Sequence, residues 1–500
     1  MNKKVLLILL FINSIFLVKP SILDGQGVIS ADSLTVKTMC KLYPFTGRNT
    51  NYILMRDRSE ISLVCYDTTF KLKHTSYFNL AELKNKSELV GVAEVGEKVM
   101  ILFSSGWVTH FSLVIYDTLT HEFRYANNFD LDGLVYLNWF PSTEKFNVVT
   151  IQKKSSIISV LSFDKEGKLS QLNINMEKEN FGLIDKMNLH DALLEEDQSF
   201  VKTLFLAKVV NGNYQSDIEG RYHAKMYYND TVFFITINKA LEHTQVLKLN
   251  ILKQSYEHYV VPYPKNDCVQ YEQFDMNSFL LNHTLFTAFI YKKGLIIGMY
   301  DLDRGVYIHE WGPEINSLNS LISSSLYFEN IFNGKIDSLK SWGKFQNKLT
   351  YTSFLSLGAN ITDEGNLDLY VGGLLFQKKA FGAMSFGNQV SGSGSSPSLS
   401  FSIPAFMLPT FALPGPLFYQ SISGAPVESH YFFKTTLKAE TLEKISASRE
   451  SIAFQKFKTD FGTEIRSKKF KNFTFFNRGR NFYYGAFIPE QNIYAFFRFQ

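Results

Sequence analysis

Two short acidic segments are the closest that the sequence comes to a metal site. The segments 301–305 (Asp-Leu-Asp-Arg-Gly) and 130–133 (Asp-Leu-Asp-Gly) each place alternate carboxylates before a glycine, as calcium-binding loops do. Neither contains the third carboxylate or the bidentate glutamate of such loops, and a calcium ion needs six or more oxygen ligands. We therefore interpret these carboxylates as turn formers, and we expect neither a metal nor a bound organic cofactor.

Sequence motifs for hydrolytic chemistry are equally incomplete. The sequence has no His-Glu-x-x-His, Gly-x-Ser-x-Gly or phosphate-loop pattern, each of which is typical of a catalytic or nucleotide-binding arrangement. Segment 162–167 is similar to the Asp-box of sialidases but lacks the Thr-Trp ending. The His-Glu pairs at 121–122 and 309–310 follow turns at comparable places, and we expect them on solvent-facing outer strands. Catalytic groups can also meet from distant segments, so an extracytoplasmic hydrolase or lyase acting on glycans or peptides remains the alternative function.

An internal repeat predicts the architecture. Six times an apolar or aromatic run breaks at a polar turn and then resumes, and the intervals between these turns are 50, 47, 86, 51 and 137 residues. A unit of about 50 residues, with insertions in the two long intervals, is typical of β-propeller blades. The six turns lie at Tyr66-Asp67, Tyr116-Asp117, Phe163-Asp164, Leu249-Asn250, Tyr300-Asp301 and Leu437-Lys438.

Each clear unit reads as three short strands in succession. The expected strands of these units are 98–103, 108–115 and 121–125; 146–151, 156–163 and 168–174; and 285–291, 295–300 and 306–311. Three C-terminal strands, 472–476, 482–488 and 493–499, are expected to close the array. Where the turn carries Asp, its carboxylate can accept a backbone N–H two residues further on. We predict an all-β fold, a β-propeller of about seven blades, with two consecutive β-sandwich domains as the alternative.

The composition is that of an ordinary globular protein with many aromatic residues. Of the 500 residues, 45% are hydrophobic, 20% are charged and 15% are aromatic. Aromatic side chains pack well across neighbouring strands, which favours the all-β interpretation. The formal net charge of +4 is small for this length. We therefore expect no nucleic-acid partner, because phosphate neutralisation requires a concentrated basic face.

The amino terminus has the pattern of a secretory signal peptide. Two lysines precede a mostly apolar stretch, 5–18, that is too short to cross a bilayer. Gly25 and Gly27 place the expected cleavage after Gly27. Residues 1–27 are then the signal peptide, and residues 28–500 form one propeller domain that is secreted or belongs to the cell envelope.

The three cysteines, Cys40, Cys65 and Cys268, are an odd number for an exported chain. Cys65 lies in the apolar run 61–66, where a thiol would serve as a small core residue on a strand. A bridge between Cys40 and Cys65 is the alternative that the sequence leaves open.

Two insertions interrupt the array. Residues 176–200 contain apolar positions near helical spacing, which predicts a short surface helix or a loop. Residues 380–427 have no charge, begin with a Gly/Ser tract and contain several prolines, which excludes a regular helix or central strand. Exposed apolar side chains on such a loop would form a docking patch for a membrane surface or a partner, and the alternative is a loop that covers a propeller face or a linker. The predicted partner-binding residues are Phe406, Met407, Leu408, Phe411, Leu413, Leu417 and Phe418.

The sequence therefore favours an exported interaction or scaffold protein over an enzyme. The repeats resemble β-propellers only at the level of fold, because they lack both a Trp-Asp signature and the double glycine of kelch repeats. Propellers carry both enzymes and binding scaffolds, so the fold alone does not select a function. We expect a protein or glycan partner, with peripheral membrane contact through the uncharged loop.

Overall fold

The computed structural model describes the chain in segments. These are residues 34–35, 41–56, 59–69, 71–83, 88–105, 109–182, 186–196, 202–204, 206–209, 222–240, 242–264, 273–291, 294–312, 321–322, 326–330, 335–339, 341–349, 354–362, 364–376, 427–445, 471–478, 481–488 and 493–499. Among these residues no helix is long and apolar enough to span a bilayer.

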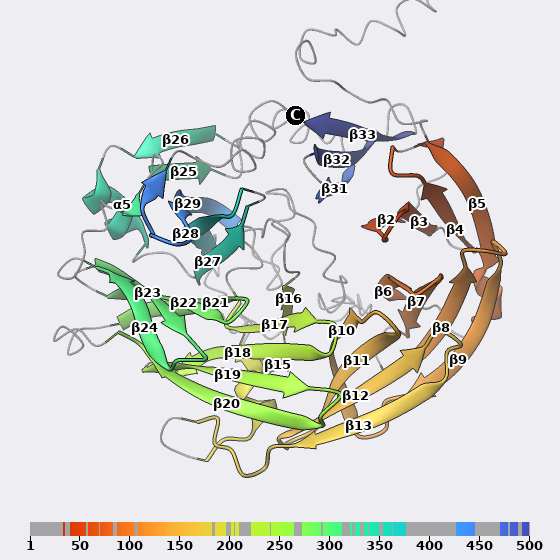
Figure 1. Cartoon of the computed structure of the whole chain (residues 1–500), viewed down its shortest axis with the longest axis horizontal. Helices are drawn as coiled ribbons and strands as arrows, with labels where there is room; N and C mark the ends of the chain where they lie inside the picture. Colours follow the sequence, from red (N-terminus) through yellow and green to blue (C-terminus); the bar gives the residue numbers. More distant parts are fainter. Residues whose placement is uncertain are drawn as a thin grey trace, which may run out of the picture.

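The described strands build a β-propeller. They form seven sheets of four or more strands, and these sheets are arranged around a ring with their first strands toward its centre (Figure 1). The sheets are numbered here as blades in chain order. Blade 1 is β2 (Lys41–Thr46), β3 (Asn51–Arg56), β4 (Glu60–Tyr66) and β5 (Leu72–Asn79). Blade 2 is β6 (Glu88–Val95), β7 (Lys98–Ser104), β8 (His110–Asp117) and β9 (Phe123–Asp130).

The next three blades follow the same order from the centre outward. Blade 3 is β10 (Leu134–Pro141), β11 (Lys145–Gln152), β12 (Ile157–Asp164) and β13 (Leu169–Asn175). Blade 4 is β16 (Ala207–Val209), β17 (Ala224–Asn229), β18 (Val232–Ala240), β19 (His243–Asn250) and β20 (Ser255–Pro262), with β16 parallel to β17. Blade 5 is β21 (Gln273–Leu281), β22 (Thr284–Tyr291), β23 (Gly294–Asp301) and β24 (Val306–Trp311).

Blade 6 departs from this pattern at its outer side. Its sheet order is β26 (Lys335–Leu339), β25 (Leu326–Asn330), β29 (Val427–Lys438), β28 (Asn366–Phe376) and β27 (Phe354–Ile361). The short strand β30 (Lys444–Ile445) also pairs with β29, and helix α5 (Trp342–Leu349) contacts β26 and β29. The outer strand therefore comes partly from a segment that precedes the three inner ones in the chain.

Blade 7 joins the two ends of the described chain. Strand β1 (Leu34–Thr35) pairs with β33 (Ile493–Phe499), which continues the sheet of β32 (Asn481–Ile488) and β31 (Lys471–Arg478). The first and last described strands thus belong to one sheet, and β31, β32 and β33 stand in the ring between blades 6 and 1 (Figure 1).

The hydrophobic core lies between the blades, because both faces of each middle strand are covered. In β7, Val99, Ile101 and Phe103 belong to the apolar cluster shared with blade 1. The alternate residues Met100 and Leu102 belong to the cluster shared with blade 3. All five side chains have no exposed surface. Stacking of sheets around an axis explains why these strands are continuous apolar runs.

The predicted strands are confirmed, with one systematic omission. The predicted turns fall at the ends of β4, β8, β12, β19, β23 and β29. Each of these is the third strand of its blade, except β19, which is the fourth strand of blade 4 because the parallel strand β16 precedes β17. The three predicted C-terminal strands are β31, β32 and β33. The prediction of three strands per unit was wrong by one strand, because each of these blades begins with a further inner strand such as β6, β10 or β21. These inner strands carry polar residues or a bulge in their ladders, which interrupts the apolar pattern on which the prediction depended.

The turn carboxylates do what was predicted of them. Asp67, Asp117, Asp164 and Asp301 each accept, through Oδ1, the backbone N–H two residues further on, at 2.8, 2.8, 3.1 and 2.9 Å. At Asp117 the adjacent Lys98 ammonium is the main cause that lowers the pKa to about 2, with the backbone bonds adding to it. These acidic residues therefore stabilise chain reversals between the third and fourth strands.

The first predicted insertion contains a helix, but that helix is partly buried. Helix α2 (Leu189–Ala192) is followed by β14 (Leu194–Glu196), which pairs with β15 (Lys202–Leu204). Leu189 and Ala192 are buried in the cluster between blades 3 and 4. The short helix therefore lies at the surface, with Asp191 44% exposed on one face and Leu189 and Ala192 packed between two blades on the other. The second insertion, 380–427, lies outside the described residues apart from Val427, the first residue of β29.

Candidate functional site

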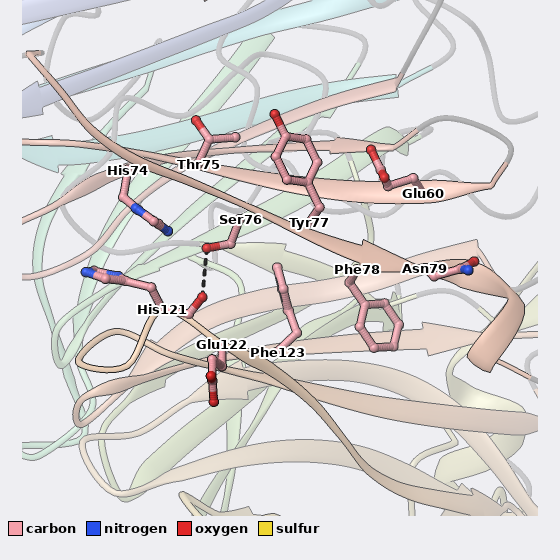
Figure 2. Close-up of a pocket in the computed structure, with 10 residues that line it drawn as sticks. All are labelled: Glu60, His74, Thr75, Ser76, Tyr77, Phe78, Asn79, His121, Glu122 and Phe123. Carbon is pink, nitrogen blue, oxygen red and sulfur yellow. Dashed lines mark hydrogen bonds between the residues drawn. The ribbon is translucent and has the colours of Figure 1, made fainter.

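A cleft of about 640 Å³ opens at the outer rim of the ring, between blades 1 and 2 (Figure 2). One wall is β5, which contributes six successive residues, His74 to Asn79, and Glu60 of β4 lies at one end. The other wall is formed by residues 121–123, where the chain enters β9. The cleft therefore follows the last strand of one blade and is closed on its inner side by the next blade. We call it the rim cleft.

Alternate residues of β5 form the contact with blade 2. The imidazole rings of His74 and His121 stack with centroids 4.1 Å apart, and Ser76 Oγ donates a hydrogen bond to the carbonyl oxygen of His121 at 2.9 Å (Figure 2). Further along, the rings of Phe78 and Phe123 lie 5.7 Å apart. Ser76 and Phe78 are buried, so this face of β5 joins the two blades.

The turn before β9 fixes the histidine side of the cleft. His121 has a positive φ of 62°, a conformation that L-residues adopt only when their surroundings hold them there. Its N–H donates to the carbonyl of Asp117 at 2.9 Å, and its Nδ1 lies 3.0 Å from the hydroxyl of Tyr116. The backbone turn and the tyrosine together orient the ring beside His74.

The thiol behind this turn is not set up as a nucleophile. Cys65 is a free, buried cysteine on β4, and its Sγ lies 3.8 Å from the Tyr116 hydroxyl. Burial raises the pKa of the Cys65 thiol to about 11. The thiol is therefore protonated at neutral pH, and only a thiolate is reactive. The prediction that Cys65 is a core residue on a strand is confirmed, whereas Cys40 lies outside the described residues.

A second group of polar residues lies at the inner strands, and its members bridge successive blades. Asn138 of β10 donates from Nδ2 to the carbonyl of Leu206, just before β16, at 2.8 Å. Asn277 of β21 donates from Nδ2 to the carbonyl of Leu355 in β27 at 2.7 Å. Each asparagine therefore ties one blade to the backbone of the next.

Lys225 of β17 occupies the corresponding place in blade 4. Its ammonium group is fully buried and donates to the carbonyl of Ser278 at 2.7 Å and to Oδ1 of Asn277 in blade 5. Lys225 and Asn277 each stand four residues before the end of their strand. We call Asn138, Lys225 and Asn277 the inner latches, since they connect blades 3 to 4, 4 to 5 and 5 to 6.

In blade 2 the residue four positions before the end of the inner strand β6 is a glycine, Gly91. A side chain at Gly91 would meet the indole ring of Trp139 at 2.4 Å, so the ring of blade 3 fills the place that a latch would take. The buried ammonium group of Lys208 lies over the Trp139 ring, 3.1 Å from the ring centroid. Burial holds the pKa of Lys208 well below its usual value, while the ring face attracts the cation.

Two titratable groups beside the latches have shifted pKa values. Asp275 accepts the N–H of Met276 at 2.8 Å and the N–H of Leu355, yet burial raises its pKa to about 7. Burial, with the nearby charge of Lys225, lowers the pKa of His223 to about 4. Shifts of this kind occur both at catalytic centres and in structural networks. Because both oxygens of Asp275 are taken by backbone donors, we assign it to the connections between blades.

The sequence-predicted sites are distributed as follows. The apolar loop residues Phe406, Met407, Leu408, Phe411, Leu413, Leu417 and Phe418 lie outside the described residues. The two acidic segments bond locally, with Asp303 2.9 Å from His283 Nδ1 and Asp130 beside His110. Within the described part of the chain, no three His, Cys, Asp or Glu side chains gather as a metal site would require.

Sequence reasoning found parts of the rim cleft but not the cleft itself. The pair at 121–122 was expected on an outer strand that faces solvent, and it lies at the entrance to the outer strand β9. The contact of residues 121–122 with β5 depends on how two blades pack together, and no local sequence pattern predicts that packing. Of the inner latches, only Lys225 stands out in the sequence, as a lysine inside the mostly apolar segment 222–228.

Comparisons with known proteins name no relative for this chain. No protein-family model matches it, and no curated protein sequence matches it. Among solved structures it is similar to the Dos1 propeller (11% identity, 64% of this chain and 62% of that chain, TM-score 0.30). It is also similar to the β-propeller domain of the trilobed protease from Pyrococcus furiosus (7%, 68% and 79%, TM-score 0.30). A third similar structure is Hsv2 of Kluyvelomyces marxianus (9%, 90% and 94%, TM-score 0.30). At these identities and TM-scores the neighbours support no inference about activity, and the fold rests on the strand order itself.

Proposed function

We propose that this β-propeller is an interaction protein that binds a partner protein in the rim cleft between blades 1 and 2. The observation that carries the proposal is the cleft itself, a volume of about 640 Å³ along the last strand of blade 1. Binding sites are usually concave, and this cleft is lined by polar residues together with Tyr77, Phe78 and Phe123. Tyr77, at one wall, has 63% of its surface exposed, and exposed tyrosine is enriched where proteins bind one another.

The polar groups of the cleft favour binding over catalysis. Ser76 donates to a main-chain carbonyl, and the His121 ring contacts a tyrosine hydroxyl. A hydrolytic serine would instead donate to the imidazole nitrogen of its base. The thiol of Cys65 is held in its protonated form by burial. The chemistry-bearing groups of the cleft are therefore engaged in joining blades.

Export and a second docking element belong to the same proposal. The signal-like sequence of residues 1–27 supports secretion or residence in the cell envelope. The uncharged, proline-containing sequence 380–427 supports attachment to a protein, glycan or membrane surface through its apolar residues. Replacing Gly382 to Ala425 with a short polar linker should abolish that attachment, measured as fractionation with the cell envelope, without a change in the melting temperature.

Site-specific cross-linking tests the rim cleft. A photoreactive phenylalanine replaces Tyr77 in the full chain, and the control carries it at Val260 of β20, which is 54% exposed on the outer strand of blade 4. We expect a discrete adduct in native cells from position 77 alone, and its loss in a chain that also carries Glu122→Lys. Equal adducts from positions 77 and 260, or none from either, would contradict the proposed function.

A further inference from the structure

We infer that the outer edge of β5 takes an extended, basic peptide segment as a fifth strand of blade 1. This inference rests on the proposed function of the rim cleft and specifies its partner and its mode of binding. Strand addition to an exposed sheet edge is a recurrent way to bind peptides, with affinity from the backbone and specificity from side chains.

The backbone of β5 points alternately inward and outward. Leu80, which continues the strand, donates its N–H to the carbonyl of Ser59 at 2.8 Å, and the register pairs Ser76 with Leu63 and Phe78 with Ile61. In an antiparallel ladder every second residue exchanges both backbone bonds with its partner. Ser76 and Phe78 therefore bond to β4, and the backbone groups of Thr75 and Tyr77 point away from it.

The described strands leave this edge unpaired. Strand β5 is the last of its sheet, with β4 as its neighbour on the inner side. Six successive residues, His74 to Asn79, line the cleft, although successive side chains of a strand point to opposite faces. A cavity that touches all six must run along the edge of the strand. The cleft therefore follows the same line as the outward backbone donors and acceptors.

The side chains around the edge select a basic partner. Among the described residues that line the cleft, Glu60 and Glu122 are the charged ones, and none is lysine or arginine. Glu122 is exposed and belongs to the wall of residues 121–123, opposite β5, with its carboxylate on the side away from β5 in this view (Figure 2). Opposite charges placed across a binding surface increase specificity and the rate of association. A segment that alternates basic and small residues would place its basic side chains toward Glu122.

The outer strand of blade 4 supplies a matched edge. Tyr263 donates its N–H to the carbonyl of Glu242 at 2.9 Å, and the register pairs Pro262 with His243. By the same alternation the backbone groups of Val260 point outward. The residue two positions further on is Pro262, whose ring removes the donor that a partner strand would need. Position 260 is therefore geometrically equivalent to position 77 but lies on an edge that proline blocks.

The test uses the full chain and a defined probe. The probe is a fluorescent octapeptide of alternating lysine and threonine, acetylated and amidated, and binding is followed by anisotropy. We expect saturable binding that falls at least about tenfold in Tyr77→Pro, because the change removes one outward N–H and leaves the β4–β5 ladder intact. Val260→Pro is the control and should bind as the unchanged chain does. Equal affinity of Tyr77→Pro and Val260→Pro would overturn the inference.

Two further arms keep the result independent of folding. Glu122→Lys alters only an exposed charge and should weaken the probe about tenfold, while a probe with glutamate in place of lysine should not bind. A probe N-methylated at alternate residues should also fail, because its backbone cannot donate to β5. Binding that survives both N-methylation and the charge reversal would refute strand addition.

Amide exchange separates this inference from the proposed function. The N–H groups of Thr75 and Tyr77 should exchange rapidly without peptide and slowly with it. Slow exchange in both states would mean that another segment of this chain or a second copy already occupies the edge, which overturns the inference. Cross-linking of a partner from position 77 without probe-induced protection would retain the proposed function and reject strand addition.

Discussion

The inner ends of blades 3 to 6 and the outer contact of blades 1 and 2 use polar residues in opposite ways. At the inner ends, Asn138, Lys225 and Asn277 are buried and each donates to the backbone of the following blade. At the outer contact, Ser76 donates to the backbone carbonyl of His121 at 2.9 Å, and its Oγ also lies 3.4 Å from the Tyr116 hydroxyl, while the neighbouring groups face a cleft. Polar groups thus join blades near the axis, whereas at the rim Ser76 joins two blades and other polar groups, such as Glu122, remain exposed.

This difference shows which polar residues are informative about function. A buried donor that loses its partner costs about 1–3 kcal/mol, and more when it is charged, so the inner latches are explained by stability alone. At the rim, Ser76 and Phe78 are buried and join the two blades, whereas Tyr77 and Glu122 are exposed, and their place beside the cleft is not required for that contact. Substitutions at the inner latches should therefore cost more stability than substitutions at the rim.

Replacing Lys225 with methionine should destabilise the propeller by about 3 kcal/mol. The change leaves the carbonyl of Ser278 and the amide oxygen of Asn277 without their charged donor in a buried place. The measurement is chemical denaturation of the full chain. Lys248→Met is the control, because Lys248 pairs with Glu257 at the surface and should cost at most about 1 kcal/mol. Equal losses would show that Lys225 does not act as a latch.

Gly91→Ala should cost about 2 kcal/mol, since overpacking of a core typically costs 1–3 kcal/mol. The new methyl group would meet the Trp139 ring, which is held by Phe146 at 5.0 Å and by Lys208. The matched variant is Gly343→Ala in helix α5, where nothing lies within 4 Å. It should stabilise the chain by up to about 1 kcal/mol, because alanine is the better helix former. A neutral Gly91→Ala would mean that blades 2 and 3 can separate slightly.

The sequence was sufficient for the parts of the fold that depend on local order. Polar turns, with aspartate in blades 1, 2, 3 and 5, and apolar runs such as 98–103 recur along the chain, and they located the second, third and fourth strands of blades 2, 3 and 5. The inner strands were not predicted, because some of their residues bond to the neighbouring blade and interrupt the apolar pattern of their own strand. Lys225, for example, interrupts an apolar pattern in order to bond to Ser278, a contact 53 residues away in the chain.

The rim cleft was beyond prediction for a related reason. His74 and His121 are separated by almost one repeat, and their rings stack only because two blades pack side by side. The sequence suggested an outer, exposed place for His121, which is correct, but not its partner. Contacts between blades depend on the relative placement of whole sheets, so they follow from the fold and not from any local pattern.

The stability of the inner region should depend on pH in two opposing ways. Asp275 has its pKa raised from 3.8 to about 7, so it retains a proton in the folded state that the unfolded chain releases. Its contribution is complete below pH 3.8 and is lost as the pH rises through about 7. His223 has its pKa lowered from 6.5 to about 4, so its contribution is present above pH 6.5 and is lost as the pH falls through about 4.

Single variants should reveal each of these slopes. Asp275→Asn should make the unfolding free energy rise more steeply with pH between about 4 and 6.5, by up to about 1.4 kcal/mol per pH unit. His223→Gln should change the slope in the opposite direction over the same range. Denaturation at four pH values from 4.5 to 7.5 measures both. Parallel curves for both variants and the unchanged chain would show that neither group is coupled to folding.

Ser76→Ala should have the smallest effect, about 0.5–1 kcal/mol, although it removes the one side-chain hydrogen bond that we compare with the inner latches. The acceptor is the carbonyl of His121, which borders an open cleft, so water can replace the lost hydroxyl. Asn277→Ala is the matched change. It also removes a hydrogen bond to a backbone carbonyl, that of Leu355, but the Asn277 side chain is fully buried, so water has no access to replace it. A cost for Ser76→Ala equal to that of Asn277→Ala would place the rim among the structural contacts, and the cleft would then be a consequence of blade packing and not a binding site.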